Sequence, residues 1–382
     1  MNVIPYGRQS ITEEDINAVV EVLKSDFLTQ GPAVVRFEEE FARVVGSKYA
    51  VAFCNATAAL HTGFSVLNTD LSKKVLVTPI TFAASSNCVL YEKGSVEFVD
   101  IDPKTFNIDL NLVEEKLKAN PNSYQGIIPV DFAGLPVDTE KLRVLADKYN
   151  LWIMEDACHA IGGGFTDSKN EFVKCGSSKY SDLTVFSFHP VKHIATGEGG
   201  MVTTNSEKMY RHLLKLRSHG IERDENLLEE KSHGGWYHEM QELGFNYRMS
   251  DINAALGLSQ LKRLSQNIER RLDVGLNYRT AFKDSKIGFQ FFDEKKYVNA
   301  YHLFVIQTDS RKELYDYLKT NKIYSQVHYL PVYKHPHYQR IGFKSLHLPH
   351  AENFYAKALS LPMFHSMTDE DLNFVIKTIR EF

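Results

Sequence analysis

The sequence predicts an α/β fold, in which a large domain with a mostly parallel sheet covered by helices is followed by a smaller C-terminal α+β domain. In the first half, short β-branched runs alternate with segments of helical periodicity. These runs are almost continuously apolar, which is typical of parallel strands buried on both faces. From about residue 250 the pattern changes to longer helical segments with mixed charge. We therefore expect the large domain, with an N-terminal helix, over 1–250 and the small domain over 251–382.

Length and composition agree with this prediction. The chain has 382 residues, of which 43% are hydrophobic and 24% charged, as in ordinary globular proteins. At roughly 150 residues per domain this length favours two domains. A formal net charge of −4 argues against a protein that binds nucleic acid by neutralising phosphates. No apolar run approaches the roughly 18–20 residues of a membrane span, and acids interrupt the N-terminus, so we expect a cytoplasmic protein.

The expected elements follow from local patterns. Ser10 and Glu13 are spaced as a capping box for a first helix, and Asp138 is an N-cap candidate for a helix with four apolar residues on one face. In the small domain we expect one long exposed helix over 252–278, a strand within 300–306 and a last helix over 369–380. The strands expected in the large domain are 75–77, 96–99, 127–130, 151–154, 184–186 and 201–204.

Several common catalytic motifs are missing. The sequence has no phosphate-binding G-x-x-x-x-G-K-[ST], no dinucleotide-binding G-x-G-x-x-G and no G-x-S-x-G of hydrolases. His238-Glu239 is not followed by the second histidine of H-E-x-x-H, and the four cysteines form no C-x-x-C. We expect no metal, because no tight metal-ligand spacing occurs among the C-terminal histidines, His328, His335, His337, His347 and His350.

A hydrophobic run that ends in two acids and a histidine is the first candidate for chemistry. It spans 151–160 and contains Asp156 and His159. An Asp at the end of a parallel strand is often only a helix cap. Alternatively, its carboxylate holds the proton on a heterocyclic cofactor nitrogen, since open parallel sheets bind ligands at their carboxyl edge.

The second candidate is a lysine in an apolar loop that is followed by glycines. A single lysine is usually a solvated surface residue. Here Lys192 has no acid nearer in sequence than Glu198, and an apolar setting lowers a lysine's pKa and favours its nucleophilic form for a Schiff base. The apolar residues around it are Phe186, Phe188, Pro190 and Ile194.

Two further segments fit the same site. Residues 53–61 are predicted to form a turn of small residues that starts a helix, and the free N–H groups of a helix start suit a phosphate. An ordinary helix start without a ligand would have the same sequence pattern. Phe82 follows a strand and is positioned either to stack on a ring or to join the core.

These four segments, in this order, resemble fold-type I pyridoxal-phosphate enzymes, and among them the sugar-nucleotide aminotransferases of the DegT/StrS type. The resemblance runs from about residue 4 to residue 382. It is closest to family members that aminate C4 of a UDP-linked 4-keto-6-deoxy-N-acetylhexosamine in pseudaminic acid biosynthesis, with L-glutamate as amino donor. The matching stretches are 27–31, 187–194, 243–249, 254–261 and 326–333.

The resemblance implies roles for individual residues. Lys192 matches the lysine that binds pyridoxal 5'-phosphate covalently and moves the proton, and Asp156 matches the acid at the pyridine nitrogen. Other positions match groups near the ring hydroxyl (His159), on the ring face (Phe82) and at the phosphate (Ala56, Thr57 and Ser187). Many relatives have Gly-Thr where this chain has Ala56-Thr57, so a methyl group lies close to the turn.

The same resemblance implies a homodimer with shared active sites. Asn246 matches an asparagine that reaches the phosphate region of the neighbouring subunit's site. Contacts to the nucleotide sugar are expected from Tyr6, Gln30, Arg248, His328 and Tyr329.

Three other functions remain open at this point. One is amination of a different 4-keto or 3-keto nucleotide sugar. Relatives that dehydrate sugars replace the lysine with histidine, so Lys192 argues against a dehydratase. A sensor that binds the sugar nucleotide without turnover would need no amino donor.

Overall fold

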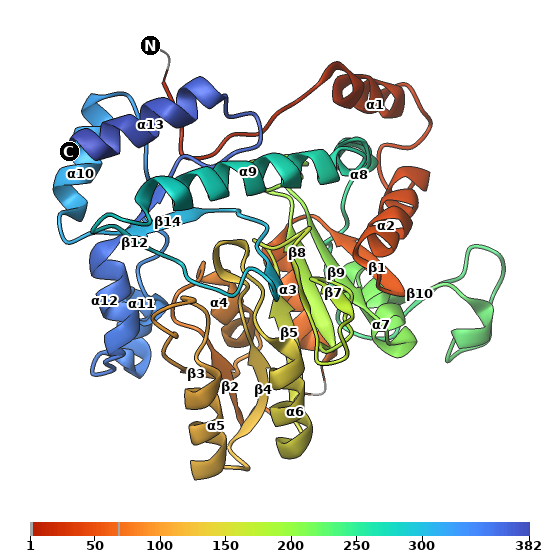
Figure 1. Ribbon diagram of the computed structural model, residues 1–382. Coiled ribbons are helices and arrows are strands. Elements are labelled where there is room, and N and C mark those ends of the chain that lie inside the picture. The colour runs from red at the N-terminus through yellow and green to blue at the C-terminus, as the bar shows by residue number, and fades with distance from the viewer. Residues whose placement is uncertain (1–2, 68) are drawn as a thin grey trace.

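The computed structural model describes residues 3–67 and 69–382, and a seven-stranded sheet lies at its centre (Figure 1). Only β9 runs antiparallel to its neighbours among these strands, and the other six run in one direction. The predicted mostly parallel sheet is confirmed. In spatial order its strands are β1 (Tyr49–Phe53), β9 (Gly200–Thr204), β8 (Leu183–Ser187), β5 (Trp152–Asp156), β4 (Tyr124–Ile128), β2 (Lys74–Val77) and β3 (Ser95–Phe98).

All six strands predicted for the large domain occur within a few residues of their expected places, and β1 was missed. Alternate strand residues enter different cores, so both faces of the sheet are covered by helices. One face packs on α3 (Ala56–Val66), α4 (Ala84–Tyr91) and α7 (Glu207–Arg217). The other packs on α2 (Pro32–Val45), α5 (Leu110–Ala119) and α6 (Thr139–Tyr149).

The first helix begins later than the sequence suggested. In α1 (Glu13–Leu23), Thr12 is the N-cap: its hydroxyl accepts a hydrogen bond from the Asp15 N–H, and the Asp15 carboxylate accepts one from the Thr12 N–H. The predicted box of Ser10 and Glu13 is therefore wrong by two residues. Asp15 is favoured here because its buried carboxylate also binds Arg263.

The long helix expected over 252–278 is two helices. They are α8 (Asp251–Leu261) and α9 (Leu264–Phe282), which are separated by Lys262 and Arg263. The expectation of an exposed helix is wrong for α8, which packs against α1 and α2. A Cβ at Gly257 would lie 2.7 Å from the Phe37 ring, so glycine permits this close packing.

The C-terminal part has its own sheet and core. Its strands are β12 (Gly288–Phe289), β14 (Phe304–Gln307) and β15 (Ala358–Leu361). Ile4 from the N-terminal segment also enters this core and bridges Ile323. The division of the chain at residue 250 stays a prediction. The helices of this part are α9, α10 (Arg311–Thr320), α11 (Pro336–Tyr338), α12 (Pro349–Lys357) and α13 (Asp369–Glu381).

Two smaller sheets lie beside the central one. The hairpin of β6 (Gly164–Thr166) and β7 (Phe172–Lys174) pairs with β13 (Tyr297–Val298), and β10 (Ile221–Glu222) pairs with β11 (Glu239–Met240). The segment around β10 and β11 extends away from the body of the molecule (Figure 1). No helix within residues 3–67 and 69–382 combines the length and the apolar character that a membrane crossing requires.

Candidate active site

Asp156 ends β5 at the carboxyl edge of the central sheet. Its Oδ2 accepts a hydrogen bond of 2.6 Å from the Ser85 hydroxyl, and its Oδ1 accepts one of 3.1 Å from the Cys158 N–H. The chain then turns through 157–163 into β6. Asp156 is therefore not the cap of a following helix, although its carboxylate is buried and hydrogen-bonded.

Ser85 was not among the site residues predicted from the sequence. It lies in α4, three residues after Phe82, and its hydroxyl also contacts the Thr81 hydroxyl at 2.7 Å. A chain of hydroxyls thus fixes the rotamer of the Asp156 carboxylate. The only signal in the sequence was that Ser85 falls in the segment that carries Phe82.

His159 lies in the turn after Asp156 and is fully enclosed. Its Nδ1 accepts a hydrogen bond of 3.3 Å from the Ala133 N–H, and its Nε2 lies 3.3 Å from the Tyr329 hydroxyl. Because Nδ1 accepts, a neutral ring carries its proton on Nε2 and donates it to Tyr329. Burial, and after it the Lys192 charge, hold the pKa of His159 well below its usual value.

Lys192 lies in the loop that follows β8, and its side chain is half-buried. Its Nζ lies 3.2 Å from Nε2 of His302. Burial lowers the pKa of Lys192 to about 8, although Cys158 and Asp156 act in the opposite direction. Lys192 is therefore not a solvated surface lysine, and an appreciable fraction of its amine is uncharged near neutral pH.

His302 and His193 also belong to this region and were missed in the sequence. The ring of His302 lies 4.3 Å from that of His159 and 5.8 Å from that of His193, measured between centroids. His193 Nε2 lies 2.8 Å from the Ala300 carbonyl oxygen, to which it donates. His302 is 110 residues away from Lys192 in the chain, so no local motif could join them.

The start of α3 lies at the carboxyl end of β1. The Asn55 side chain caps the Ala58 N–H at 2.8 Å, whereas the N–H groups of Ala56 and Thr57 have no acceptor within the described chain. Ser187 pairs in register with Gly200 on the neighbouring strand. A Cβ at Gly200 would lie 2.7 Å from the Ala56 nitrogen, so glycine lets β9 approach this helix start. Free N–H groups at a helix N-terminus suit a phosphate.

Phe82 is 63% exposed and does not join the core. It lies between β2 and α4, and its ring centroid is 6.4 Å from that of Tyr329 in an edge-on arrangement. An exposed aromatic face beside Tyr329 is available to a planar ligand.

The N-terminal and C-terminal segments meet at the same site. The ring centroids of Tyr6 and His328 are 5.4 Å apart, and those of His328 and Tyr329 are 4.8 Å apart. Nδ1 of His328 lies 2.8 Å from the Ser360 hydroxyl. Burial, and then the charge of Lys192, lower the pKa of His328 to about 3, so this imidazole is neutral.

Three of the expected site residues have backbone neighbours outside the group around Lys192. Gln30 precedes Gly31, whose N–H donates to Asp251 at the start of α8. Arg248 bridges Phe53, and Asn246 bridges Ser218. Within the described residues no hydrogen bond, ion pair or ring contact joins any of these three side chains to Lys192, His159 or Tyr329.

The assembled groups fit pyridoxal phosphate. The buried Asp156 carboxylate suits a protonated pyridine nitrogen, and two free N–H groups with Ser187 suit a phosphate. The half-buried Lys192 amine, with its lowered pKa, suits covalent attachment to an aldehyde. These groups come from the carboxyl ends of β1, β5 and β8, where open parallel sheets bind ligands.

Comparison with known proteins supports the same interpretation. Residues 9–380 match the DegT/DnrJ/EryC1/StrS aminotransferase family. A Campylobacter jejuni protein named UDP-4-amino-4,6-dideoxy-N-acetyl-beta-L-altrosamine transaminase is 37% identical over 98% of this chain and 96% of its own length. The spore coat polysaccharide biosynthesis protein SpsC of Bacillus subtilis is 36% identical over 99% of this chain and 96% of its own length.

Solved structures agree over the whole chain. Helicobacter pylori PseC, described as an aminotransferase involved in the biosynthesis of pseudoaminic acid, superposes with a TM-score of 0.87 at 32% identity and covers 100% of this chain and 99% of its own. The PLP-form of a putative sugar aminotransferase, Spr1654 of Streptococcus pneumoniae, gives a TM-score of 0.90 at 27% identity and covers 100% of this chain and 98% of its own.

Proposed function

Because this chain belongs to the DegT/DnrJ/EryC1/StrS aminotransferase family, it is a pyridoxal-phosphate-dependent sugar aminotransferase, and we propose that it aminates C4 of a UDP-linked 4-keto-6-deoxy-N-acetylhexosamine with L-glutamate as donor. The observation that carries the proposal is the half-buried Lys192, whose pKa is lowered to about 8, at the sheet edge that also holds the buried Asp156. The 37% identity to the Campylobacter transaminase, whose name gives a 4-amino-4,6-dideoxy sugar nucleotide, supports this choice of sugar.

The chain's own groups would hold the cofactor as follows. The Asp156 carboxylate, fixed by Ser85, would accept a hydrogen bond from the protonated pyridine nitrogen. The N–H groups of Ala56 and Thr57, with the Ser187 hydroxyl, would bind the phosphate. Phe82 would cover one ring face, and His159 would lie near the ring hydroxyl. When bound, pyridoxal phosphate supplies an electron sink for the charge left after proton removal.

Lys192 would then do the proton transfers. As a free amine it takes the proton from the α-carbon of glutamate, and in the second half of the reaction it delivers a proton to C4 of the sugar. A lysine with a pKa of about 8 is matched to both tasks near neutral pH. Because 2-oxoglutarate leaves before the sugar reacts, the kinetics should be ping-pong.

The sugar nucleotide would lie against Tyr6, His328 and Tyr329, which surround the Lys192 site. Gln30, Arg248 and Asn246 would come from the second subunit or from the rim. The segment around β10 and β11 supports a dimer, because its apolar side chains are exposed in the single chain: Trp236 is 79%, Met240 65% and Leu243 81% exposed.

Product analysis with paired substrates tests this function. The enzyme is incubated with L-glutamate and with 4-keto UDP-sugars that differ only in the configuration at C5, and the products are examined by NMR. We expect a 4-amino sugar, with stoichiometric 2-oxoglutarate, from one member of the pair. A 3-amino product, or sugar dehydration without glutamate consumption, would contradict the proposal, as would binding without turnover.

A further inference from the structure

Lys192 has a buried neighbour that neither the family motifs nor the proposed roles explain. The Nε2 atom of His302 lies 3.2 Å from Nζ, which is hydrogen-bonding distance. The His302 ring is 4% exposed, and its Nδ1 has no partner among the described residues. Among the described residues, Lys192 is therefore the only hydrogen-bonding partner of this imidazole ring.

The segment that carries His302 is held from two sides. The fully buried Arg271 donates through Nη1 to the carbonyl oxygens of Tyr301 and His302, at 3.0 and 3.4 Å. On the other side, the Ala300 N–H donates to the Gly134 carbonyl at 2.9 Å. Gly134 has a φ of +106°, and a Cβ there would lie 2.6 Å from the Tyr301 nitrogen. The imidazole thus projects from a backbone that has little freedom to move.

The charges around His302 keep its ring neutral. The groups that face it are Lys192, His159, His193 and Arg271, all of which are cationic or able to become so. Burial, and after it these charges, hold the pKa of His302 well below its usual value. A neutral imidazole has one lone pair, and the nitrogen that faces an ammonium must be the acceptor.

We propose that His302 is a positioning residue for Lys192: its Nε2 lone pair accepts a hydrogen bond from Nζ whenever the lysine is not bonded to the cofactor, and so fixes the amine between the two half-reactions. The inference rests on the role proposed for Lys192. In this arrangement the proton of the His302 ring is on Nδ1, and the other positions on the Lys192 Nζ atom are free for proton transfer.

The hydrogen bond has a consequence for the titration of Lys192. An acceptor at 3.2 Å stabilises the ammonium form, in the same direction as Asp156 and Cys158, and against burial and Arg271. Removing the acceptor should lower the pKa of Lys192 further and let the amine move. Each effect has a separate measurement.

The first measurement uses cofactor-free protein and no sugar. Competitive acetylation between pH 6 and pH 10, followed by peptide mass analysis, gives the titration midpoint of Lys192, with the exposed Lys312 as internal reference. His302→Leu should lower the Lys192 midpoint by about one pH unit, since a hydrogen bond to a charged group is lost. His302→Gln, whose Oε1 replaces Nε2 as acceptor, should restore it. His365→Leu is the control, because this half-buried histidine has no hydrogen bond to Lys192.

The second measurement is turnover. His302→Leu should lower kcat about tenfold, because an amine that is free to move is less well placed for proton transfer, and it should leave KM for the nucleotide sugar unchanged. His302→Gln should recover activity to within about threefold of wild type. If His302 had a purely structural role, the leucine and glutamine variants would not differ in both the Lys192 midpoint and kcat.

The proposal is overturned if His302→Leu matches His365→Leu in both the Lys192 midpoint and kcat. Should His302→Leu fail to fold, imidazole ¹⁵N NMR of cofactor-free wild type decides, with His302 assigned from the glutamine variant. We expect a neutral ring with its proton on Nδ1, and an Nε2-protonated or charged ring at pH 7 contradicts the proposal. A confirmed Lys192 shift without amination of the tested sugars would reject the proposed substrate and keep the role of His302.

Discussion

At the scale of single residues, burial sets the chemistry of each group in the site. It lowers the pKa of Lys192 to about 8 and keeps His159, His302 and His328 neutral. Neutral histidines can donate and accept at the same time, and they leave Lys192 as the group that exchanges protons near pH 7. Asp156 is an acid of this site whose carboxylate has two donors of its own, the Ser85 hydroxyl and the Cys158 N–H.

Asp156→Asn should retain the cofactor and lose about 100-fold or more in kcat. The substitution removes the charge that keeps the pyridine nitrogen protonated, whereas the phosphate and ring contacts survive. Cofactor content is measured by absorbance and turnover by 2-oxoglutarate release. Ser85→Ala is the matched control: it removes the 2.6 Å hydrogen bond and keeps the carboxylate, so its loss should stay within about tenfold. Near-normal activity of Asp156→Asn would assign the role to another acid, such as Glu155.

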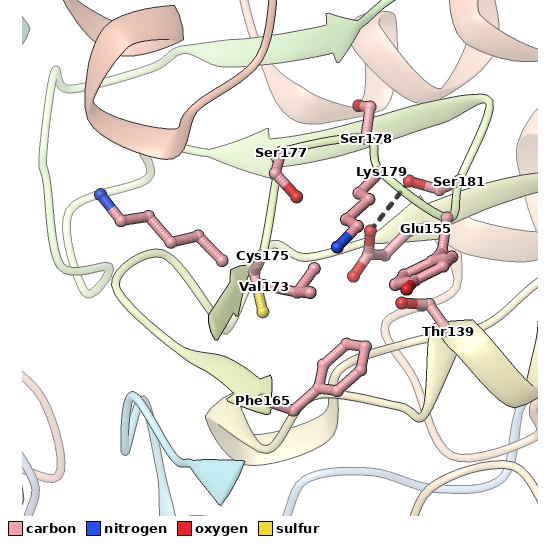
Figure 2. A pocket seen from close by; sticks show the side chains of 11 residues that line it. Thr139, Glu155, Phe165, Val173, Cys175, Ser177, Ser178, Lys179 and Ser181 are labelled. Carbon is pink, nitrogen blue, oxygen red and sulfur yellow. Dashed lines mark hydrogen bonds between the residues drawn. The ribbon is translucent and has the colours of Figure 1, made fainter. Parts of the chain in front are cut away.

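Glu155 belongs instead to a buried acid pair on the far side of the strand. Its side chain accepts hydrogen bonds from Ser181 and Thr184, and it lines a small cavity with Cys175 (Figure 2). One carboxylate oxygen each of Asp131 and Glu155 and the Sγ atom of Cys175 lie within 4.8 Å of one another. Burial raises the pKa of Glu155, and burial followed by the charge of Glu155 raises the pKa of Asp131 well above its usual value. We infer that the two carboxyl groups share a proton.

This pair makes stability depend on pH with a defined sign. The folded protein keeps a proton that the unfolded chain releases above about pH 4, so the free energy of unfolding falls as pH rises above that value. Glu155→Gln should remove this slope and gain about 1 kcal/mol or more over wild type at pH 8, because the amide donates to Asp131 without a shared proton. Thermal unfolding of cofactor-free protein between pH 5 and pH 9 measures the difference.

Glu97→Gln is the control of opposite sign. Burial alone would raise the pKa of Glu97, but hydrogen bonds from Lys116 and Lys74 lower it overall. This variant should therefore lose stability near neutral pH and approach wild type only as pH falls below about 4.5, so its profile is extended to pH 3. Parallel pH profiles of wild type and Glu155→Gln would contradict the shared proton.

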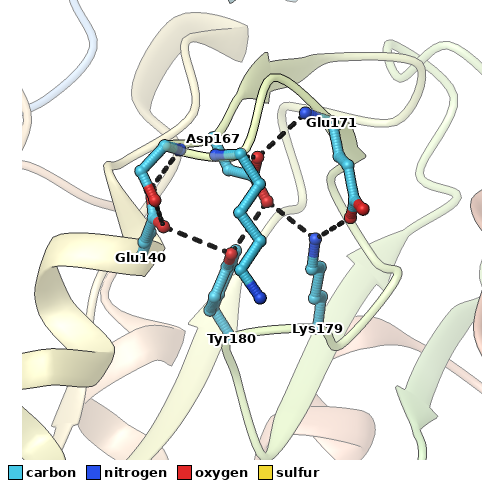
Figure 3. A network of polar contacts seen from close by, with 7 residues as sticks. Glu140, Asp167, Glu171, Lys179 and Tyr180 are labelled. Atoms are coloured by element: carbon cyan, nitrogen blue, oxygen red, sulfur yellow. Dashed lines mark hydrogen bonds and ion pairs between the residues drawn. The ribbon is translucent and has the colours of Figure 1, made fainter.

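At the scale of elements, the β6–β7 hairpin holds the turn that carries His159. Residues 157–163 join β5 to β6, and a polar network ties this hairpin to the segment before β8 and to α6 (Figure 3). Asp167 accepts hydrogen bonds from Lys179 and Tyr180 at 2.7 and 2.8 Å, and Glu140 of α6 accepts from Ser168. The hydrogen bond from Lys179 is the largest cause that holds the pKa of Asp167 well below its usual range.

Asp167→Asn should loosen the hairpin and leave the central sheet intact. The amide can still accept from the backbone, but it brings no charge to Lys179. We expect several-fold faster hydrogen exchange over 164–174 at pH 7 and unchanged exchange in β4 and β5. Glu171→Gln is the matched control, because this partner of Lys179 is 65% exposed and exposed ion pairs contribute little. Equal exchange in the two variants would show that Asp167 does not anchor the hairpin.

The elements also show what the sequence could predict. The apolar runs predicted six strands of the central sheet, but β1 (Tyr49–Phe53) alternates two alanines with larger residues and gives a weak strand signal. The break between α8 and α9 was missed because Arg263 leaves the helical pattern to bind Asp15, 248 residues away. Lys192 and Asp156 could be found because they follow strands. Ser85 and His302 could not, since their partners lie 71 and 110 residues away.

At the scale of the whole molecule, the single chain leaves apolar side chains exposed that a second subunit would cover. Trp236 and Leu243 are about four-fifths exposed in the segment that extends from the body (Figure 1). Asn246 follows this segment and has no hydrogen bond to Lys192 of its own chain within the described residues. We propose a two-fold homodimer in which Asn246 of each chain serves the site that contains the other chain's Lys192. In a closed dimer each such contact occurs twice.

Complementation between two inactive chains tests this arrangement. Lys192→Ala and Asn246→Asp chains, each inactive alone, are co-expressed in equal amounts with different affinity tags, and the doubly tagged dimers are confirmed. A mixed dimer then holds one site with both defects and one with neither. Random pairing makes about half of the dimers mixed, so roughly a quarter of all sites should be intact. If both residues served one chain's own site, every site would carry a defect, and activity would stay at the level of the single variants. Purified mixed dimers give a larger difference in activity. Half of their sites should be active if the sites are shared, and none should be active if each chain's site uses only its own residues.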